Sequence, residues 1–280
     1  MTKIRLCALD VDGTLIDSNF GITEAVGRAV DALEQSGIIP AIVTGRTVKE
    51  LEVLRARFPY LRYFIVSNGA YAFDAVTGTS FYKDLLPLEL AKIVVDEAQQ
   101  YSVMIEVYAD GASHVDAAAW ANKAAYRVEF LTHPSLGPAR IPTEDVRRFL
   151  ADRTSDVEKL YISFEHLSDL EALHAFCQKF PVDLVVSIHD GLEVNQRGVE
   201  KGAGLKALCD RLCILPEETA AIGDGFADIP MLRFAGLSIA MGNAAEEVKA
   251  AAKLVAPDHD HDGAAWAIEQ VLAAQSCGFK

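Results

Sequence analysis

Two aspartates directly follow the first apolar run of the chain and could together hold a cation or handle protons. The run Ile4–Leu9 leads into Asp10, Val11 and Asp12. This spacing puts both carboxylates on one side of an extended chain, while Val11 points the other way. Neighbouring carboxylates repel each other unless a cation or a shared proton relieves them, so the pair suits a hard cation such as Mg²⁺. The alternative is a solvated strand end, which is common for a single aspartate but less so for a pair.

A hydroxyl, a glycine and an arginine follow the second apolar run. Thr44, Gly45 and Arg46 come directly after Ile38–Val43, at the start of a predicted helix. Free backbone amides at a helix N-terminus, together with an arginine fork, can cradle an anion. Thr-Gly is also a routine way to enter a helix, so this element alone does not specify an anion site.

Three further charged residues stand where later helices begin. Lys201 precedes Gly202 at the start of one helix, and Asp224 and Asp228 follow the predicted strand Thr219–Ile222. Glycines around Asp224 allow a close approach of the backbone. A single lysine is usually a solvated surface charge, and Lys201 gains a role only if it faces the same edge of the sheet as the carboxylates.

The elements that must position these residues form an α/β pattern at both ends of the chain. Strands predicted at 4–9, 38–43 and 63–66 alternate with helices at 23–36 and 48–58, and the rhythm resumes after Gly198. This alternation predicts a doubly wound parallel sheet, whose carboxyl edge is where such folds bind ligands. From about Leu86 to Ser187 the pattern changes to hairpins mixed with helices, with a turn at Asp110-Gly111. We therefore predict an α/β core of residues 1–85 and 189–280 with an inserted α+β cap domain of residues 86–188.

Composition excludes several classes of function. The 280 residues include 26 Lys or Arg and 40 Asp or Glu, which gives a formal net charge of −14. Generic affinity for nucleic acid or for an anionic membrane needs a basic surface, so neither partner is expected. The five cysteines are scattered and odd in number, unlike a disulfide framework. The sequence shows no signal peptide or membrane-length apolar run, which predicts a cytoplasmic protein, and it leaves the oligomeric state open.

The order of these motifs resembles that of the haloacid dehalogenase superfamily of phosphotransferases. The motifs are Asp-x-Asp-Gly-Thr at residues 10–14, Thr-Gly-Arg at 44–46, Lys-Gly at 201–202 and Gly-Asp-Gly-x-x-Asp at 223–228. The inserted segment, Ser67–Ala70, Ala240–Ala244 and Asp262-Gly263 resemble the Cof-type sugar-phosphatase branch. One position departs from that branch, because Ala227 stands where its members commonly carry asparagine, and we expect activity to survive this difference.

The resemblance implies a Mg²⁺-dependent phosphatase that acts on a small phosphorylated metabolite, with sugar phosphates as the first candidates. It implies that Asp10 is the nucleophile that forms an aspartyl-phosphate, and that Asp12 is the general acid and then the general base. The remaining implied roles are metal binding by Asp10, Asp12, Asp224 and Asp228, phosphate binding by Thr44, Gly45 and Lys201, and candidate substrate contacts from Arg46, Asn195 and Asn243.

Other functions stay open beside this one. A dedicated phosphatase of the mannosyl-glycerate or sucrose type is one, and a phosphomutase, which would return the phosphoryl group to the substrate instead of releasing phosphate, is another. A sensor that binds a phosphometabolite without turnover is a third, against which the intact acidic and lysine motifs argue. The tract around His259 and His261 resembles a metal-binding tract, but its position in a loop before a helix favours a solvated loop.

Overall fold

The computed structural model describes residues 3–134, 139–187 and 190–276, which form two compact units. The first unit comprises Met1–Gly45, Arg55–Lys83 and Glu200–Lys280, and the second comprises Arg46–Leu54 and Asp84–Val199. The predicted boundary after residue 85 falls close to the junction at Lys83. The predicted boundary between residues 188 and 189 lies outside the described residues, and the second unit continues to Val199.

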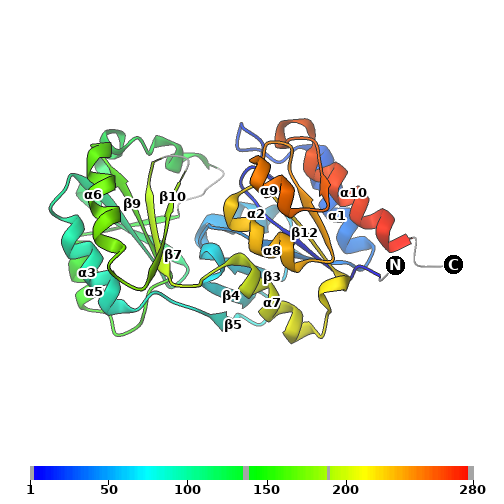
Figure 1. The fold of residues 1–280 in the computed structure, drawn as a ribbon, viewed down its shortest axis with the longest axis horizontal. Helices are drawn as coiled ribbons and strands as arrows, with labels where there is room; N and C mark the ends of the chain where they lie inside the picture. Colours follow the sequence, from blue (N-terminus) through cyan, green and yellow to red (C-terminus); the bar gives the residue numbers. More distant parts are fainter. Residues whose placement is uncertain (1–2, 135–138, 188–189, 277–280) are drawn as a thin grey trace. The chain divides into compact units, whose positions relative to one another are not determined.

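The first unit is built on an eight-stranded sheet in the order β14-β13-β12-β1-β2-β3-β4-β5 (Figure 1). Its strands are β1 (Leu6–Leu9), β2 (Ile39–Val43), β3 (Tyr63–Val66), β4 (Tyr71–Asp74), β5 (Thr79–Lys83), β12 (Thr219–Gly223), β13 (Leu237–Ala240) and β14 (Leu254–Val255). From β14 to β3 all neighbours are parallel, and β4 and β5 add an antiparallel hairpin. Leu9 pairs with Ile42 on one side and with Ile222 on the other, so β1, β2 and β12 end at nearly the same level.

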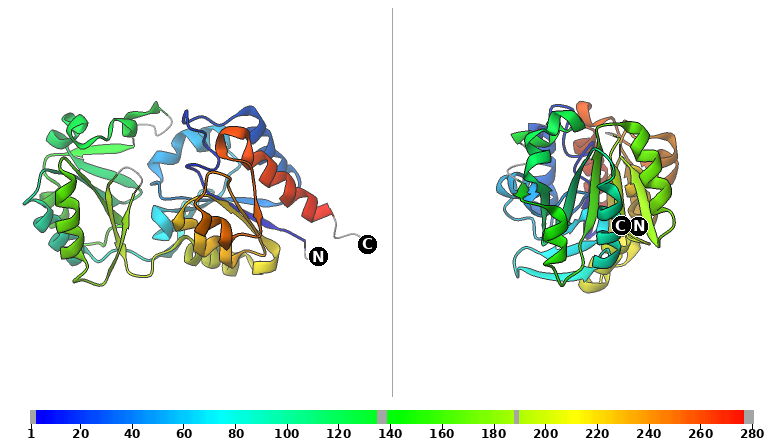
Figure 2. Two further views of the ribbon diagram at one scale, coloured as in Figure 1. Left: turned by 45° about the horizontal axis from the view of Figure 1, so that its top comes forward. Right: turned by 90° about the vertical axis from the view of Figure 1, so that its left-hand side faces the viewer.

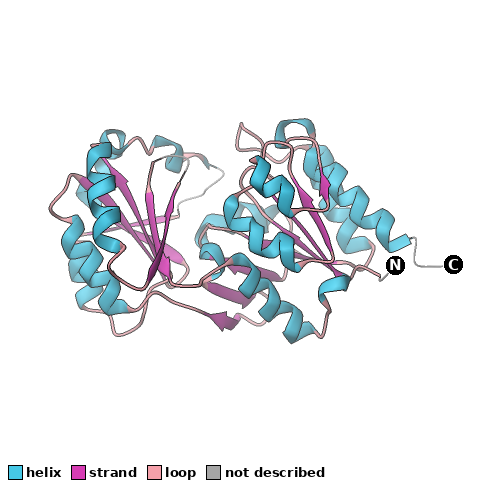
Figure 3. Cartoon of the chain, viewed as in Figure 1, coloured by secondary structure: helices cyan, strands magenta, loops and turns pink. Residues whose placement is uncertain are grey.

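Helices cover both faces of this sheet, as a doubly wound fold requires. The helices of the unit are α1 (Glu24–Gln35), α2 (Glu52–Arg57, which begins just before Arg55), α7 (Lys201–Leu212), α8 (Ile229–Phe234), α9 (Glu246–Ala251) and α10 (Gly263–Ser276). Helices α1 and α10 pack together on one face, while α7, α8 and α9 pack on the other (Figures 1 and 3). Helix α1 begins where the sequence predicts, since Oγ1 of Thr23 accepts a hydrogen bond from the Val26 N–H at 3.2 Å.

The second unit is built on a six-stranded sheet, in the order β10-β11-β9-β6-β7-β8, with its longer helices on one face (Figures 2 and 3). Its strands are β6 (Val103–Ala109), β7 (Ala112–Asp116), β8 (Arg140–Thr143), β9 (Lys159–Phe164), β10 (Val182–Val186) and β11 (Leu192–Gln196). Its helices are α3 (Leu88–Ala98), α4 (Ala117–Ala121), α5 (Val146–Ala151) and α6 (Leu167–Cys177). Alternate residues of β6, β9 and β11 form an apolar core with α3, α5 and α6, while the opposite face of these strands carries Glu106, Lys159 and Glu193.

The predicted fold class, a doubly wound α/β core with an inserted α+β domain, is confirmed. The turn at Asp110-Gly111 joins β6 to β7 as expected. The β4–β5 hairpin, β8, β11 and β14 were missed, because their short, polar or alternating sequences lack the continuous apolar runs that mark the central strands. Among the described residues, no helix combines the length and apolar character needed to cross a membrane.

Candidate active site

The loop after β1 carries Asp10 and Asp12 and turns tightly at Gly13. Asp10 is buried, and its backbone N–H donates to the Ile222 carbonyl oxygen of β12 at 3.0 Å, whereas Asp12 is exposed. Gly13 has a φ of +71°, and a Cβ atom at this position would lie 2.3 Å from Oδ2 of Asp224. The β1 loop therefore lies directly against the Asp224 side chain, and its positive φ at this point favours glycine.

The loop after β12 is folded around the buried carboxylate of Asp228. Oδ2 of Asp228 accepts hydrogen bonds from the backbone N–H groups of Asp224, at 3.0 Å, and of Gly225, at 2.8 Å. Asp228 is the last residue of a 3₁₀ turn, Phe226–Asp228, in which Ala227 is exposed. Hydrogen bonding from a side chain back to nearby backbone is typical of aspartate in turns. It holds the loop so that the Asp224 side chain lies beside Gly13.

Lys201, the first residue of α7, is buried among these carboxylates. Its Nζ donates to Oδ1 of Asp10 at 2.7 Å and to Oδ1 of Asp228 at 2.6 Å. Burial by itself lowers the pKa of a lysine, but the charges of Asp10 and Asp228 and the hydrogen bonds to them raise the pKa of Lys201 above its usual value. The structure therefore places a permanent ammonium group beside the nucleophile candidate.

Three carboxylates surround this single ammonium group, so the cluster carries excess negative charge. One oxygen from each of Asp10, Asp224 and Asp228 lies within 4.8 Å of the others. Burial, followed by the charge of Asp228, raises the pKa of Asp10 well above its usual value despite the opposing charge of Lys201. Burial and then Asp228 also raise the pKa of Asp224, to about 6. A bound cation would relieve this repulsion, and carboxylate oxygens are the donors that a hard divalent cation prefers.

Thr44 and Gly45 follow β2, the strand next to β1. Because β1 and β2 are parallel and end level, the residues after each strand leave the sheet at the same edge. Thr44 is buried, its N–H donates to the Ile65 carbonyl oxygen at 2.9 Å, and its carbonyl oxygen accepts from the Asn68 N–H at 3.1 Å. These bonds fix the backbone of Thr44 one strand away from Asp10.

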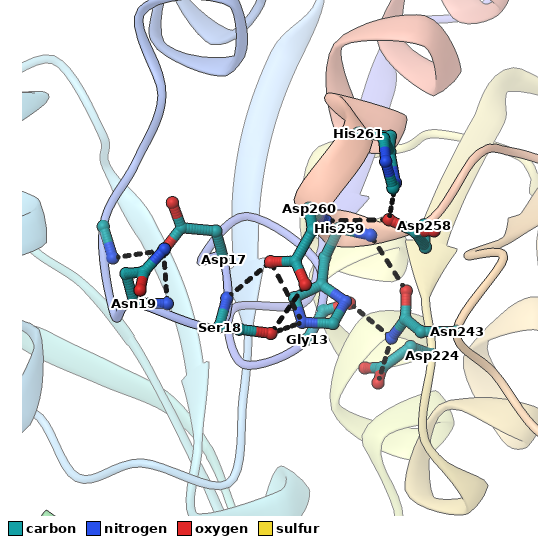
Figure 4. A network of polar contacts seen from close by, with 11 residues as sticks. Gly13, Asp17, Ser18, Asn19, Asp224, Asn243, Asp258, His259, Asp260 and His261 are labelled. Carbon is teal, nitrogen blue, oxygen red and sulfur yellow. Dashed lines mark hydrogen bonds and ion pairs between the residues drawn. The ribbon is translucent and has the colours of Figure 1, made fainter.

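Two side chains contact Asp224 that the sequence did not assign to it. Oγ1 of Thr14 donates to Oδ1 of Asp224 at 3.3 Å. Nδ2 of Asn243 donates to Oδ2 of Asp224 at 3.0 Å (Figure 4). The sequence predicts a substrate contact for Asn243 and no contact for Thr14. Asn243 follows β13, which lies beside β12 and ends at the same edge, and this order of strands is known only from the folded sheet.

Arg46 and Asn195 belong to the second unit. Arg46 is buried, and its Nη1 donates to the Glu50 carbonyl oxygen at 3.4 Å. Asn195 is a buried residue of β11 whose Oδ1 has no hydrogen-bond partner among the described residues. Their assignment as substrate contacts stays a prediction. His259 and His261 are in no metal-binding group found among the described residues.

A doubly wound sheet with carboxylates and a buried lysine at its carboxyl edge is typical of α/β enzymes, which bind their ligands at that edge. The sequence pattern of the haloacid dehalogenase-like hydrolases matches residues 7–268. The chain therefore belongs to this family, in its Cof-type branch, and is a phosphatase.

Similar proteins match over nearly the full length of the chain. The stress response protein YhaX of Bacillus subtilis is 28% identical over 97% of this chain and 94% of its own length. The 5-amino-6-(5-phospho-D-ribitylamino)uracil phosphatase YitU of Bacillus subtilis is 26% identical over 94% of this chain and 96% of its own. The chain also resembles the crystal structure of a haloacid dehalogenase-like hydrolase from Bacteroides thetaiotaomicron, with 27% sequence identity and a TM-score of 0.83. The match covers 96% of this chain and 100% of that one. Other relatives are named as phosphatases of pyridoxal phosphate and of HMP-PP.

Proposed function

We propose that this chain hydrolyses phosphomonoesters of small metabolites with Mg²⁺ as its cofactor, through an aspartyl-phosphate formed on Asp10. The observation that carries the proposal is the position of Lys201, whose Nζ contacts Asp10 at 2.7 Å and Asp228 at 2.6 Å inside a cluster of three carboxylates. A carboxylate nucleophile and a phosphate dianion repel each other, so the reaction needs positive charge fixed at the same place. Lys201 supplies one charge, and the excess of carboxylates favours a bound cation as the second.

We assign the cation to the carboxylates of Asp10 and Asp224 and to the backbone carbonyl oxygen of Asp12. When bound, Mg²⁺ supplies charge neutralisation for the phosphoryl oxygens and the nucleophile. Asp228 was predicted to be a metal ligand as well. Both of its oxygens are hydrogen-bonded, Oδ1 to Lys201 and Oδ2 to two backbone N–H groups, which favours a role in fixing the lysine and the loop.

In the first step, a carboxylate oxygen of Asp10 attacks phosphorus and the bond to the leaving alcohol breaks. Asp12 donates its proton to the leaving oxygen. Asp12 is exposed and lies two residues after Asp10, so it can reach both substrate and water. Lys201, the hydroxyl of Thr44 and the N–H of Gly45 hold the phosphoryl oxygens during the transfer.

In the second step, water gives a proton to the carboxylate of Asp12 and attacks phosphorus. The bond between phosphorus and Asp10 breaks, and inorganic phosphate leaves. Asp12 is then protonated again and Asp10 is again a carboxylate, so the site returns to its starting state. Dividing the hydrolysis into two displacements lets one acid–base group serve both halves.

The substrate we propose is a small phosphorylated metabolite, with sugar phosphates and sugar-alcohol phosphates as the first candidates. Membership in the Cof-type branch supports this class, and so do the relatives named for a phosphorylated ribitylaminouracil and for pyridoxal phosphate. We assign selection of the leaving group to the second unit, as a cap with its predicted limits near residues 86 and 188. Arg46 and Asn195 are its candidate contacts, and we place the enzyme in the cytoplasm.

The test is phosphate release from a panel of phosphate esters by the full chain, with MgCl₂ and with EDTA. We expect hydrolysis that depends on MgCl₂, and we expect Asp10→Asn to lower kcat by at least about 10⁴-fold because the nucleophile is removed. Asp210→Asn is the matched control, since Asp210 is an exposed aspartate on α7 that pairs only with the neighbouring Lys206 among the described residues. Unchanged phosphate release by Asp10→Asn would refute the proposed mechanism.

A further inference from the structure

The side chain of Asn243 joins three loops of the first unit. Its Nδ2 donates to the Gly13 carbonyl oxygen and to Oδ2 of Asp224, both at 3.0 Å, and its Oδ1 accepts from the His259 N–H at 3.1 Å (Figure 4). Both amide protons and the amide oxygen are therefore engaged. Only one orientation of the amide satisfies all three partners, because two of them are acceptors and one is a donor.

We propose that Asn243 is a positioning residue that fixes the carboxylate of Asp224 at the cation site. The inference rests on the proposed function only in taking Asp224 as a metal ligand. A carboxylate at the end of a rotatable side chain has a choice of orientations, and a donor fixed on one oxygen removes that choice. Because the same amide group also holds the Gly13 carbonyl, Asn243 sets the spacing between the β1 loop and the β12 loop.

Asn243 can act in this way only if its own backbone is held. The N–H of Met241 donates to the Gly223 carbonyl oxygen at 3.0 Å, and the N–H of Gly242 donates to the Pro257 carbonyl oxygen at 3.1 Å. A Cβ atom at Gly242 would lie 2.7 Å from the backbone nitrogen of Asp258. The segment before Asn243 is thus tied to the end of β12 on one side and packed against residues 257–258 on the other.

The segment before Asn243 packs against the 258–262 loop, and hydrogen bonds hold this loop to residues near the N-terminus. The carboxylate of Asp260 accepts from the N–H and from Oγ of Ser18, both at 2.8 Å (Figure 4). Oγ1 of Thr23 donates to Oδ1 of Asp262 at 2.6 Å, and Oδ1 of Asp258 accepts from the Asp260 N–H at 3.0 Å. The acidic tract that resembles a metal site in the sequence therefore forms a structural support, which holds His259 where its N–H meets Asn243.

This role differs from the substrate contact predicted for Asn243. Both N–H donors of the amide already have acceptors, so a substrate contact would require one of these bonds to break. A positioning residue affects the metal ion before any substrate is present, whereas a substrate contact affects only KM for the substrate. The two roles can therefore be separated by measuring Mg²⁺ binding alone.

The experiment titrates MgCl₂ into the metal-free full chain by calorimetry, with no substrate present. We expect Asn243→Ala to raise the Kd for Mg²⁺ by about 10–100-fold, which is the usual effect of losing a partner of a metal ligand. At saturating MgCl₂, KM for the substrate should stay within about 2-fold, a smaller change than the loss of one hydrogen bond normally produces. Asn19→Ala is the matched control, because Asn19 is an exposed asparagine whose recorded hydrogen bond uses only its backbone N–H.

An unchanged Kd for Mg²⁺ in folded Asn243→Ala overturns the inference, and a raised KM in the same variant would assign Asn243 to the substrate. Asn243 is exposed, so water can replace its bonds and we expect the variant to fold. If Asn243→Ala does not fold, Ser18→Ala provides the test. We expect it to raise the Kd for Mg²⁺ by at least about 2-fold, because it weakens the 258–262 loop. An unchanged Kd for Mg²⁺ again overturns the inference. If the native protein binds Mg²⁺ but releases no phosphate from any ester, the proposed function fails while the inference about Asn243 stands.

Discussion

Each unit of this protein buries one cation between two carboxylates, and the two clusters differ in what remains uncompensated. In the first unit, Lys201 lies between Asp10 and Asp228, with 5% of its side chain exposed. In the second, Arg140 contacts Oε1 of Glu50 at 2.8 Å and Oε2 of Glu106 at 3.0 Å, with 3% of its side chain exposed. Both arrangements remove charges from water, which is costly unless each charge is paired and hydrogen-bonded.

In the arginine cluster, neutral donors contact one oxygen of each glutamate. Oε2 of Glu50 accepts from the N–H of Thr47 at 2.7 Å and from its hydroxyl at 3.0 Å. Oε2 of Glu106 accepts from Oγ of Ser113 at 2.5 Å. Arg140 reaches its two carboxylates with Nη2 and Nε, which are held in one plane by the rigid guanidinium group. The charges in this cluster therefore hold strands β6, β7 and β8 together with the segment around Glu50.

The lysine cluster differs because it contains a third carboxylate, which leaves its negative charge only partly compensated. Asp224 stands near Asp10 and Asp228, and its pKa is raised to about 6 by burial and by Asp228. The cluster is built on loops at strand ends, whereas Arg140, Glu106 and Ser113 are strand residues. The comparison teaches that buried charge alone does not mark an active site. A larger excess of one charge sign, located at the edge of a sheet where strands end, is the better indicator.

The largest expected effect comes from removing either cation. Arg140→Met should lower the free energy of unfolding by about 3–5 kcal/mol, because it leaves two buried glutamates without their partner. Lys201→Met should cost a similar amount in EDTA, but part of this loss should return in MgCl₂ because the ion replaces the missing positive charge. Urea unfolding of the full chain, followed by circular dichroism, measures both variants against the native protein under each condition.

Arg147→Met is the matched control for these two variants. Arg147 pairs with Asp145 at 3.3 Å on the surface of the second unit, where about half of its side chain is exposed (53%). Such a pair contributes about 1 kcal/mol at most. Equal rescue of Lys201→Met and Arg140→Met by MgCl₂ would break the comparison, since the lysine cluster has three carboxylates for one cation and the arginine cluster has two.

The sequence predicts the lysine cluster far better than the arginine cluster. Asp10, Asp224 and Lys201 stand directly at the ends or starts of strongly apolar elements, and parallel strands must bring those ends to one edge. Glu106 and Arg140 instead occupy alternating positions in strands, where a charge normally faces water. The alternation shows which side chains share a face but cannot show what covers that face.

The role of Asn243 was beyond sequence reasoning for a related physical reason. Its partners are Gly13, Asp224 and His259, which come from three loops. No local spacing links Asn243 to Gly13 or Ser18 to Asp260, because these contacts depend on the order of strands in the folded sheet. The acidic tract around His259 was predicted to be a solvated loop, and its hydrogen bonds to Ser18 and Thr23 were missed.

A smaller effect is expected from pH in the lysine cluster. The pKa of Asp224 is raised from 3.8 to about 6, so the folded protein holds this proton more tightly than the unfolded chain does. Without metal, Asp224 therefore stabilises the fold below about pH 4, and this contribution is lost as the pH rises through about 6. The raised pKa of Asp10 acts in the same direction.

Mg²⁺ must displace this proton, so its Kd should rise as the pH falls below about 6, by about 10-fold per pH unit for each proton displaced. Calorimetric titrations of MgCl₂ at several pH values between 5 and 8 measure the change. In Asp224→Asn the pH dependence should become shallower, since one of the two raised carboxylates is gone. A Kd that is the same at pH 5 and pH 8 would show that these carboxylates do not bind the ion.

The smallest expected effects come from the hydroxyl groups that donate to one carboxylate in each cluster. Ser113→Ala should lower the free energy of unfolding by about 1.5–3 kcal/mol, because the bond to Glu106 is short, charged and fully buried. Thr14→Val should cost only about 0.5–1 kcal/mol, since its bond to Asp224 is 3.3 Å long and Asn243 remains as a second donor. Urea unfolding in EDTA compares the two.

The order of these two losses tests why the clusters differ. If the hydrogen bonds of the arginine cluster hold its strands together, each of its donors matters to stability, and loss of the Ser113 hydroxyl must cost more than loss of the Thr14 hydroxyl. If the lysine cluster exists to bind a cation, Thr14→Val should affect the Kd for Mg²⁺ more clearly than it affects unfolding. A larger stability loss from Thr14→Val than from Ser113→Ala would reverse the assignment of the two clusters, because the supposed cation site would then be the one on which the fold depends.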